Sequence, residues 1–220
     1  MAEAWTQGDG SVTDRAWIAD WRRRIAALYA EVRALAVTDP GAALAHWRAV
    51  REGLFREHPQ SPVPAPARAT FRAAHFEPDP SLRFEIVVEP APRSTPGAFA
   101  LDLPDGGADT LAVSRMGRIV IPFAAGPRSL SVFWMAGYVG GLFIPFRDAT
   151  NGSETYGAGR YLIDAAKSAD LGGDPTTGTL TVDFNFAFQP SCAFDPRWAC
   201  PLAPPENRLD LPVRAGERLA

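Results

Sequence analysis

The residue types best suited to chemistry gather in two short segments of the C-terminal half, GRYLIDA and TLTVDFNFAF. In the second segment apolar residues alternate with polar ones, which predicts a strand with Asp183 and Asn185 together on one face. If the two segments pair as antiparallel strands with Arg160 opposite Asn185, Arg160 lies diagonally within reach of Asp183. The same register brings Asp164 onto this face. The sequence thus predicts a sheet face that carries one guanidinium, two carboxylates and one carboxamide.

Such a face has two interpretations. As a ligand site, Arg160 would hold an anionic group through its planar fork, and Asp183 or Asp164 would act as a general base if burial raised its pKa. The preceding loop, TYGAGR, adds Tyr156 and two glycines whose backbone amides can approach a ligand. In the other interpretation, the same groups form a buried ion pair and hydrogen bonds that fix the strand register.

Both cysteines of the chain, Cys192 and Cys200, lie in the proline-rich stretch SCAFDPRWACPLAPPENRL. A zinc site needs four ligands, and the chain offers neither a second cysteine pair nor a histidine nearby in sequence, so no metal is predicted. A disulfide across the Asp-Pro turn is feasible in geometry but disfavoured in a reducing compartment. The favoured interpretation is that two small apolar side chains pack beside a turn anchored by Phe194 and Trp198.

The remaining bases and nucleophiles do not form a recognisable catalytic set. Lys167 is the only lysine, and its polar loop, AAKSADLGGD, contains nothing expected to desolvate it, which disfavours Schiff-base chemistry with pyridoxal phosphate. His46 and His58 fall in a helical segment and His75 in the first strand, far in sequence from the aspartates. No GxSxG, HExxH or phosphate-loop motif is present. The sequence predicts no cofactor and leaves open whether the chain is an enzyme.

Charge and hydropathy limit the classes of partner that the chain can bind. The net charge is −3 and evenly spread, so no segment has the basic excess of a nucleic-acid-binding surface. The most apolar stretch, residues 130–146, is too short and too broken by glycine and proline to span a bilayer. The N-terminus, MAEAWTQGDG, lacks the features of a secretory signal. We therefore expect a cytoplasmic protein that binds neither nucleic acid nor membrane and has a small molecule as its partner.

The elements that position these residues begin with two helices. Apolar residues from Ile18 to Leu35 recur at three- and four-residue spacing, and Ser11 is one of the residues that can cap this helix. Asp39-Pro40 predicts the start of a second helix, which His58-Pro59 ends. We expect a helical hairpin whose apolar faces cover a sheet. A dimeric coiled coil is the alternative, but the pattern is too short to favour it.

The rest of the chain consists mainly of a connector and segments with the composition of β-strands. Residues 60–68, QSPVPAPAR, predict an extended proline-rich connector. From residue 71 short β-rich segments follow one another, and SRMGR predicts a hairpin turn around Gly117. The expected fold is α+β and mainly β: a helical hairpin on an antiparallel barrel or sandwich, crossed by a proline-rich C-terminal strap. We place the helical part at residues 1–69 and the β domain with its strap at 70–220, as one structural unit.

Several long motifs carry a family resemblance. The segments FIPFRDATNGSETYGAGRYLIDA, VDFNFAFQPSCAF and CPLAPPENRLDLPVRAGER resemble the bacterial and archaeal domain-of-unknown-function family sixteen eighty-four, and WRAVREGLFREHPQSPV resembles its N-terminal segment more thinly. The positions that match its signature are Tyr156, Gly157, Gly159, Arg160, Asp183, Asn185, Pro190, Cys192, Cys200, Pro201, Glu206, Asn207 and Arg208. Phe186 and Phe188 depart from it, because they stand where the family usually has Arg and Tyr.

The resemblance implies a mainly β protein but carries no activity. It also groups Glu206, Asn207 and Arg208, at the end of the strap, with the polar sheet face. Our first hypothesis is a small-molecule-binding or enzymatic domain in which Arg160 anchors an anion and Tyr156, Asp183, Asn185, Glu206 and Arg208 complete the site. The competing hypothesis is a non-catalytic structural or interaction protein whose polar signature fastens the strap to the sheet. An open cavity around Arg160 and Asp183 would favour the first, and a sealed cluster the second.

Overall fold

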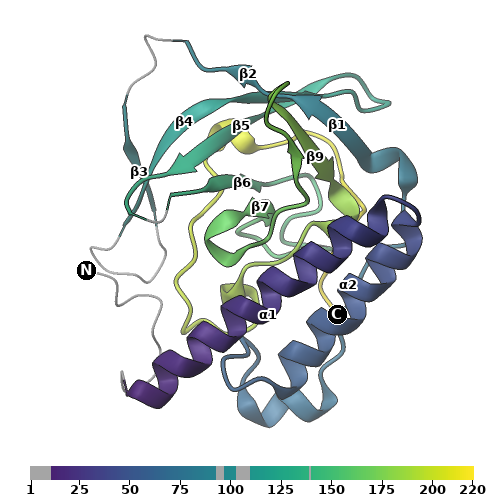
Figure 1. Cartoon of the computed structure of the whole chain (residues 1–220). Coiled ribbons are helices and arrows are strands. Elements are labelled where there is room, and N and C mark those ends of the chain that lie inside the picture. Colours follow the sequence, from purple (N-terminus) through teal and green to yellow (C-terminus); the bar gives the residue numbers. More distant parts are fainter. Residues whose placement is uncertain (1–10, 93–96, 103–109, 139) are drawn as a thin grey trace.

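Two helices form the predicted hairpin. A computed structural model describes residues 11–92, 97–102, 110–138 and 140–220, so the N-terminal segment on which the secretory-signal expectation rests lies outside it. Helices α1 (Val12–Ala36) and α2 (Pro40–Glu57) run side by side across one face of the molecule (Figure 1). The Ser11 side chain accepts a hydrogen bond from the amide of Asp14 at 3.1 Å, and Asp39 accepts one from Ala42 at 2.9 Å. Both helices therefore start at their expected caps.

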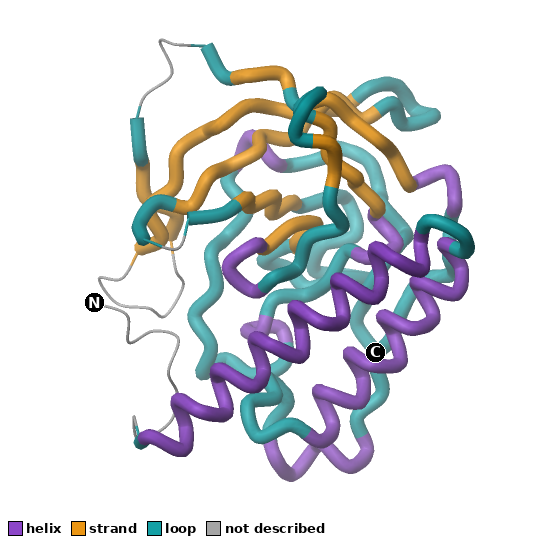
Figure 2. Tube along the Cα trace, in the orientation of Figure 1, coloured by secondary structure: helices purple, strands orange, loops and turns teal. Residues whose placement is uncertain are grey.

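The strands that the structure describes form two sheets, and these strands all pair in antiparallel fashion. The smaller sheet has the order β1 (Arg83–Val87), β9 (Thr179–Asp183), β8 (Gly173–Asp174). The larger has the order β2 (Glu89–Pro90), β4 (Thr110–Ile121), β5 (Arg128–Met135), β6 (Leu142–Phe146), β7 (Arg160–Asp164), and β3 (Phe99–Asp102) also pairs with β4. The fold is α+β and mainly β, as predicted, and long loops of the C-terminal half run between the helices and the sheets (Figure 2).

Two apolar clusters hold these layers together. In the first, Leu28 of α1 and Trp47 of α2 pack in one cluster with Phe133 of β5. The second includes Leu130 of β5 and Val182 of β9, so this cluster joins the two sheets. Each fully buried side chain of this size contributes about 1.5–3 kcal/mol through apolar burial. The helical hairpin is thus an integral layer of the fold.

The predicted hairpin around Gly117 is wrong. Strand β4 runs unbroken past this residue, and the pairing with β5 shifts between Arg115 and Gly117, which marks a β-bulge. A side-chain Cβ at Gly117 would lie 2.4 Å from the carbonyl oxygen of Glu89. The glycine is therefore required where β2 closely approaches β4, and it does not reverse the chain.

The segment between the helices and the first sheet also differs from expectation. Residues Ala65–Thr70 form a short 3-10 helix where an extended connector was predicted, with the amide of Ala67 donating to Pro64. The expected strand at residues 71–76 is reduced to one bridge between His75 and Glu217. Isolated prolines start a 3-10 turn as readily as they extend a chain, because their fixed φ suits both.

The predicted pairing of the two polar strands is wrong as well. Strand β7 pairs with β6, with Arg160 opposite Phe146, and β9 pairs with β1, with Asp183 opposite Arg83. Strand β9 also ends at Asp183, because this side chain accepts from the amide of Asn185 at 2.9 Å and caps the 3-10 helix Phe184–Phe186. The alternating apolar pattern beyond residue 183 therefore belongs to a short helix and a loop.

Part of the C-terminal strap lies against β5 and the end of β6 in the larger sheet. Arg147, just after β6, and Arg208 form a parallel bridge, with the amide of Arg147 donating to the Asn207 carbonyl at 2.9 Å and that of Leu209 to Arg147 at 2.8 Å. Within the described part of the chain, no helix is both long and apolar enough to cross a membrane.

Candidate functional site

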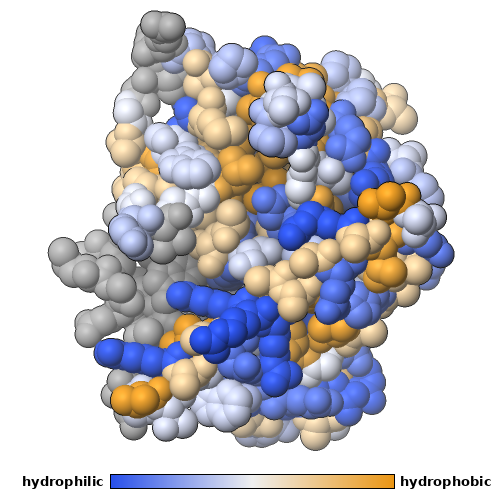
Figure 3. All heavy atoms as spheres, viewed as in Figure 1, coloured by the Kyte–Doolittle hydropathy of each residue, from blue (hydrophilic) through white to orange (hydrophobic). Residues whose placement is uncertain are grey.

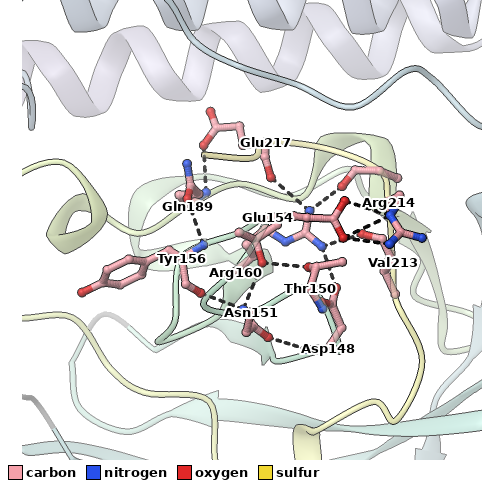
Figure 4. Close-up of polar contacts among 12 residues, drawn as sticks. Asp148, Thr150, Asn151, Glu154, Tyr156, Arg160, Gln189, Val213, Arg214 and Glu217 are labelled. Carbon is pink, nitrogen blue, oxygen red and sulfur yellow. Dashed lines mark hydrogen bonds and ion pairs between the residues drawn. The ribbon is translucent and has the colours of Figure 1, made fainter. Parts of the chain in front are cut away.

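Arg160, the predicted anion anchor, is completely buried and bonded to the protein itself. Its Nη2 forms an ion pair with Asp148 at 2.7 Å and donates to the carbonyl of Val213 at 2.8 Å. Its Nη1 donates to the carbonyls of Ala215 and, at 3.1 Å, Glu217. Figure 4 shows the guanidinium surrounded by these groups, which come from the loop after β6 and from the C-terminal segment. Of its three guanidinium nitrogens, only Nε has no hydrogen-bond partner within the described part of the chain.

A second arginine fastens the same C-terminal segment from the helical side. Arg51 of α2 forms an ion pair with Glu217 at 2.5 Å, and the other carboxylate oxygen of Glu217 accepts from the amide of Gln189 at 2.8 Å. The guanidinium lies over the rings of Phe55 and Phe188 at 4.4 and 5.0 Å. Phe188, one of the departures from the family pattern, thus supports this buried ion pair.

Asp183 and Asn185 lie in a different place and hold another junction. The carboxylate of Asp183 accepts from the backbone and side-chain amides of Asn185 and lies 3.6 Å from Arg83. Asn185 in turn exchanges two hydrogen bonds of 2.8 Å with the backbone of Asp79. Burial raises the pKa of Asp183, while these hydrogen bonds oppose the rise. The pair ties the turn before β1 to the end of β9.

The loop before β7 is shaped by backbone contacts. The amide of Tyr156 donates to the side chain of Gln189 at 3.2 Å, and its ring points away from Arg160 (Figure 4). Gly159 has φ +105, and a Cβ there would lie 2.5 Å from the carbonyl oxygen of Phe146. This glycine therefore permits the close approach of β6. Gly157 has no such restriction, because the nearest atom to its Cβ would be 4.0 Å away.

The Glu206-Asn207-Arg208 group sits on the larger sheet. Asn207 is fully buried; its Oδ1 accepts from the amide of Ser131 at 2.8 Å, and its Nδ2 donates to the carbonyls of Ser131 and Pro145 at 3.0 and 2.7 Å. Glu206 forms an ion pair with Arg115 of β4. The side chain of Arg208 is exposed. The six predicted site residues thus divide among separate junctions of the fold.

A cavity of about 440 Å³ offers an alternative location for a site. Its wall combines the inner face of α1, part of α2, the neighbouring ends of β4 and β5, the loop after β7 and parts of the segment 188–200. Apolar side chains dominate it, among them Ile25, Trp21, Phe55, Met135 and Trp198. The outward face of α1, by contrast, is mainly hydrophilic (Figure 3). Two further hollows, of about 510 and 420 Å³, are formed largely by helix residues and short adjoining segments.

The charged side chains that the described residues contribute to the cavity wall are cationic. These are Arg22, Arg51 and Lys167, and no described aspartate or glutamate belongs to the wall. Lys167 is half-buried and lies 3.2 Å from Asp164. Burial alone would lower the pKa of Lys167, but the Asp164 carboxylate and the nearby cysteines outweigh burial and raise it. The expectation that nothing desolvates this lysine is therefore wrong.

The two cysteines lie next to each other, and one of them belongs to the same wall. Both are free thiols; Cys200 is buried and lines the cavity, and its Sγ accepts from the amide of Cys192 at 3.4 Å. A hydrogen bond from the Cys192 thiol, supported by the charge of Lys167, lowers the pKa of Cys200 to about 6, although burial opposes this. The same bond raises the pKa of Cys192. Of the described residues, no three His, Cys, Asp or Glu side chains are grouped so as to hold a metal ion.

Sequence reasoning missed this cavity because its wall comes from segments far apart in the chain. Ile25 and Trp21 belong to the apolar stripe of α1, and that stripe predicts a core face whether or not a space lies beneath it. Only the unusual composition of the loop and strap, a single lysine in one and both cysteines in the other, sets these residues apart in the sequence.

Comparisons with known proteins agree with the fold. The family model described as "Protein of unknown function (DUF1684)" matches residues 70–218. The solution NMR structure of an uncharacterised protein from Haloarcula marismortui is 33% identical, with a TM-score of 0.57, over 81% of this chain and 93% of that one. None of the curated proteins matches. The chain therefore belongs to the DUF1684 family, which confirms the resemblance seen in its sequence.

Proposed function

We propose that this member of the DUF1684 family is a small-molecule-binding protein whose ligand, an apolar molecule with an anionic group, occupies the cavity between α1 and the segment 188–200. The observation that carries the proposal is the cavity itself: a mainly apolar space of about 440 Å³ whose wall, as far as the structure describes it, includes cations and no acidic side chain. Ligand sites of this kind are mostly apolar, hold a few placed polar groups and span roughly 300–1,000 Å³.

The charges in the wall favour an anion. Arg51 and Lys167 belong to the wall, whereas their carboxylate partners, Glu217 and Asp164, do not. A molecule in the cavity is therefore exposed to the cations more directly than to the carboxylates. Arg22 has no carboxylate partner among the described residues. A carboxylate or phosphate that enters the cavity meets favourable charges in a partly desolvated environment, where Coulomb interactions are stronger than in water. The apolar part of the ligand would pack on α1 and β5.

The same proposal moves the site away from the residues first suspected. Arg160 and Asp183 are sealed and bonded to the protein, so we infer that they keep the scaffold in place and do not contact the ligand. We also infer that the two sheets form a sandwich, since β9 and β5 contribute to one apolar cluster. The helical part, residues 1–69, and the β part, residues 70–220, share another cluster and would act as one unit.

A different function remains our second proposal. The bonds of Arg160 and Asn207 to the strap and its surroundings support a non-catalytic structural or interaction protein whose signature fastens the strap to the sheet. In that case the cavity would be a packing defect with no ligand of its own. The two proposals differ in what small molecules do to the protein's stability.

Decanoate and decanol, which match in chain length and differ in charge, provide a test of the first proposal. A ligand that binds the folded state stabilises it by about 2.7 kcal/mol at one hundred times its Kd. We expect decanoate to raise the Tm of the full chain and to do so more than decanol does. Ala166→Trp should abolish the shift, because Ala166 lies in the cavity wall and is itself exposed. Ala30→Trp, on an exposed position of α1 outside the wall, is the matched control.

The outcome separates the two functions. Equal shifts for Ala166→Trp and wild type, or no shift with either compound, would leave the structural protein as the supported function. Equal shifts with decanoate and decanol, both lost in Ala166→Trp, would support the cavity but overturn the anionic class of the ligand.

A further inference from the structure

The segment between the two cysteines reverses direction and brings their thiols together. The carboxylate of Asp195 accepts from the amide of Arg197 at 3.0 Å, and its carbonyl accepts from Trp198 at 3.2 Å, which closes a turn midway between Cys192 and Cys200. As a result, the amide of Cys192 reaches the Sγ of Cys200, and the two side chains are hydrogen-bonded. A disulfide forms only between cysteines whose side chains are adjacent, so this pair could form one with little movement of the backbone.

Charge and access differ between the two sulfur atoms. Cys200 lines the cavity together with Lys167, the only lysine of the chain. The Nζ of Lys167 is held between Asp164, at 3.2 Å, and the ring of Tyr161, at 5.7 Å. The Tyr161 hydroxyl donates to the carbonyl of Pro201 at 2.6 Å and so fixes the residue next to Cys200. Cys200 thus lines a cavity whose wall also contains a fixed cation, whereas Cys192 is hydrogen-bonded to Cys200, does not line the cavity and is only partly buried.

We propose that Cys200 and Cys192 form a peroxide-reactive dithiol in the cavity wall, with Cys200 as the attacking thiolate, Cys192 as the resolving thiol and Lys167 as the positioning residue that supports the thiolate. This arrangement does not depend on the ligand proposed above. It assigns a reaction to two residues that, from the sequence alone, we interpreted as packed apolar side chains.

The reaction is balanced by a hydroperoxide as oxidant. The Cys200 thiolate attacks the protonated oxygen of the peroxide, an S–O bond forms as the O–O bond breaks, and the departing hydroxide or alkoxide takes up from solvent a proton equivalent to the one Cys200 lost on ionising. The Cys200 sulfenic acid that forms is then attacked by the sulfur of Cys192. The S–S bond forms, hydroxide leaves, and the proton of Cys192 converts it to water. Two electrons pass from the two thiols to the peroxide.

Lowered pKa and burial have opposite effects on the rate. A thiol that ionises near pH 6 is almost all thiolate at pH 7, but its intrinsic nucleophilicity falls with its pKa, so the gain in rate over an ordinary thiol is only a few-fold. The informative quantity is therefore the pH at which the rate is half-maximal. The ionisable groups around the pair are Lys167, Asp164, Tyr161 and Tyr156.

The test is mass spectrometry of the full chain after treatment with hydrogen peroxide, acid quenching and alkylation under denaturing conditions. We expect wild type to lose both alkylatable thiols and to carry one intramolecular disulfide that dithiothreitol reverses. Cys192→Ser should stop at a sulfenic acid, about 16 Da heavier, that dimedone traps. In Cys200→Ser the remaining thiol should react a few-fold more slowly than Cys200 does in Cys192→Ser, since an ordinary thiol is mostly protonated at pH 7. Lys167→Gln should raise the half-maximal pH of the reaction.

Three results would overturn the inference. The first is wild type that keeps two alkylatable thiols, which needs no variant to fold. The second is disulfides formed only between chains. The third is Cys200→Ser that oxidises as fast as Cys192→Ser. Because peroxide serves as the probe, loss of decanoate binding alone would count against the proposed function and not against this dithiol.

Discussion

Arg160→Met should be strongly destabilising, because this side chain connects the C-terminal segment to the loop after β6. Methionine keeps much of the apolar stem but removes the ion pair with Asp148 and the hydrogen bonds to the carbonyls of Val213, Ala215 and Glu217. Loss of one partner from a buried pair costs about 3–5 kcal/mol. A carbonyl that stays buried without a partner costs about 1–3 kcal/mol more.

These losses do not add in full, since the C-terminal segment can move into water. We therefore expect the free energy of unfolding to fall by about 4–6 kcal/mol, a large share of the about 5–15 kcal/mol typical of a domain. Urea unfolding followed by tryptophan fluorescence measures the change. Hydrogen exchange at Glu217, whose amide donates to Ala187 at 2.8 Å, shows whether the segment detaches first.

The matched control is Arg214→Met, which removes an exposed arginine from its pair with Glu154. Exposed pairs contribute little, so this variant should unfold almost as wild type does. A fall of less than about 1 kcal/mol in the free energy of unfolding of Arg160→Met would refute the reasoning, because removing one partner of a buried ion pair usually costs several times more. Such a result would also reopen Arg160 as a ligand anchor.

Other predictions concern the backbone, the strap and pH. Gly159→Ala should lower the free energy of unfolding by at least about 2 kcal/mol, because its φ is +105 and its Cβ meets a carbonyl, whereas Gly157→Ala, which has room, should not; equal effects in urea melts would contradict this. Asn207→Ala should cost roughly 3 kcal/mol by the same assay, since it leaves buried backbone groups of Ser131 and Pro145 without partners; an unchanged midpoint would count against the fastening role. Burial lowers the pKa of His75 below its ordinary 6.5, so stability should fall as the pH drops below about 6.5, until the pH passes the folded-state pKa. His75→Gln should reduce that slope, and an identical slope would place the titration elsewhere.

The helical part of the fold could be predicted because its signals are local. Ser11 and Asp39 cap their helices through side chains three residues from the amides they bind, so the sequence contains both partners. The strands β5, β6 and β7 were also visible as short β-rich segments. The prediction that failed concerned long-range strand pairing. We expected the strands that carry Arg160 and Asp183 to pair with each other, but they belong to different sheets. A local hydrogen bond from Asn185 to Asp183 was enough to end β9 where the apolar alternation continued.

The candidate site was harder to predict for a related reason. Arg160 and Asp183 were predicted as site residues because their side chains are suited to ligand binding or catalysis. Both are buried, and their polar groups form most of their hydrogen bonds with the protein itself. The cavity is built instead from apolar side chains that look like ordinary core. Lys167 appeared solvated because its loop is polar, but Asp164 and the ring of Tyr161 enclose it. Placement in three dimensions, more than residue type, decides which groups are available to a ligand.

The most direct test of the ligand proposal is the position of a bound probe. Intermolecular nuclear Overhauser effects between carbon-13-labelled decanoate and the full chain report which methyl groups it contacts. The proposal predicts contacts from the alkyl chain to the methyl groups of Met135 and Ile25, both in the cavity wall, and their loss in Ala166→Trp. Contacts confined to Leu44 and Ala45, in the hollow beside α2, or no contacts at saturating decanoate, would contradict the account.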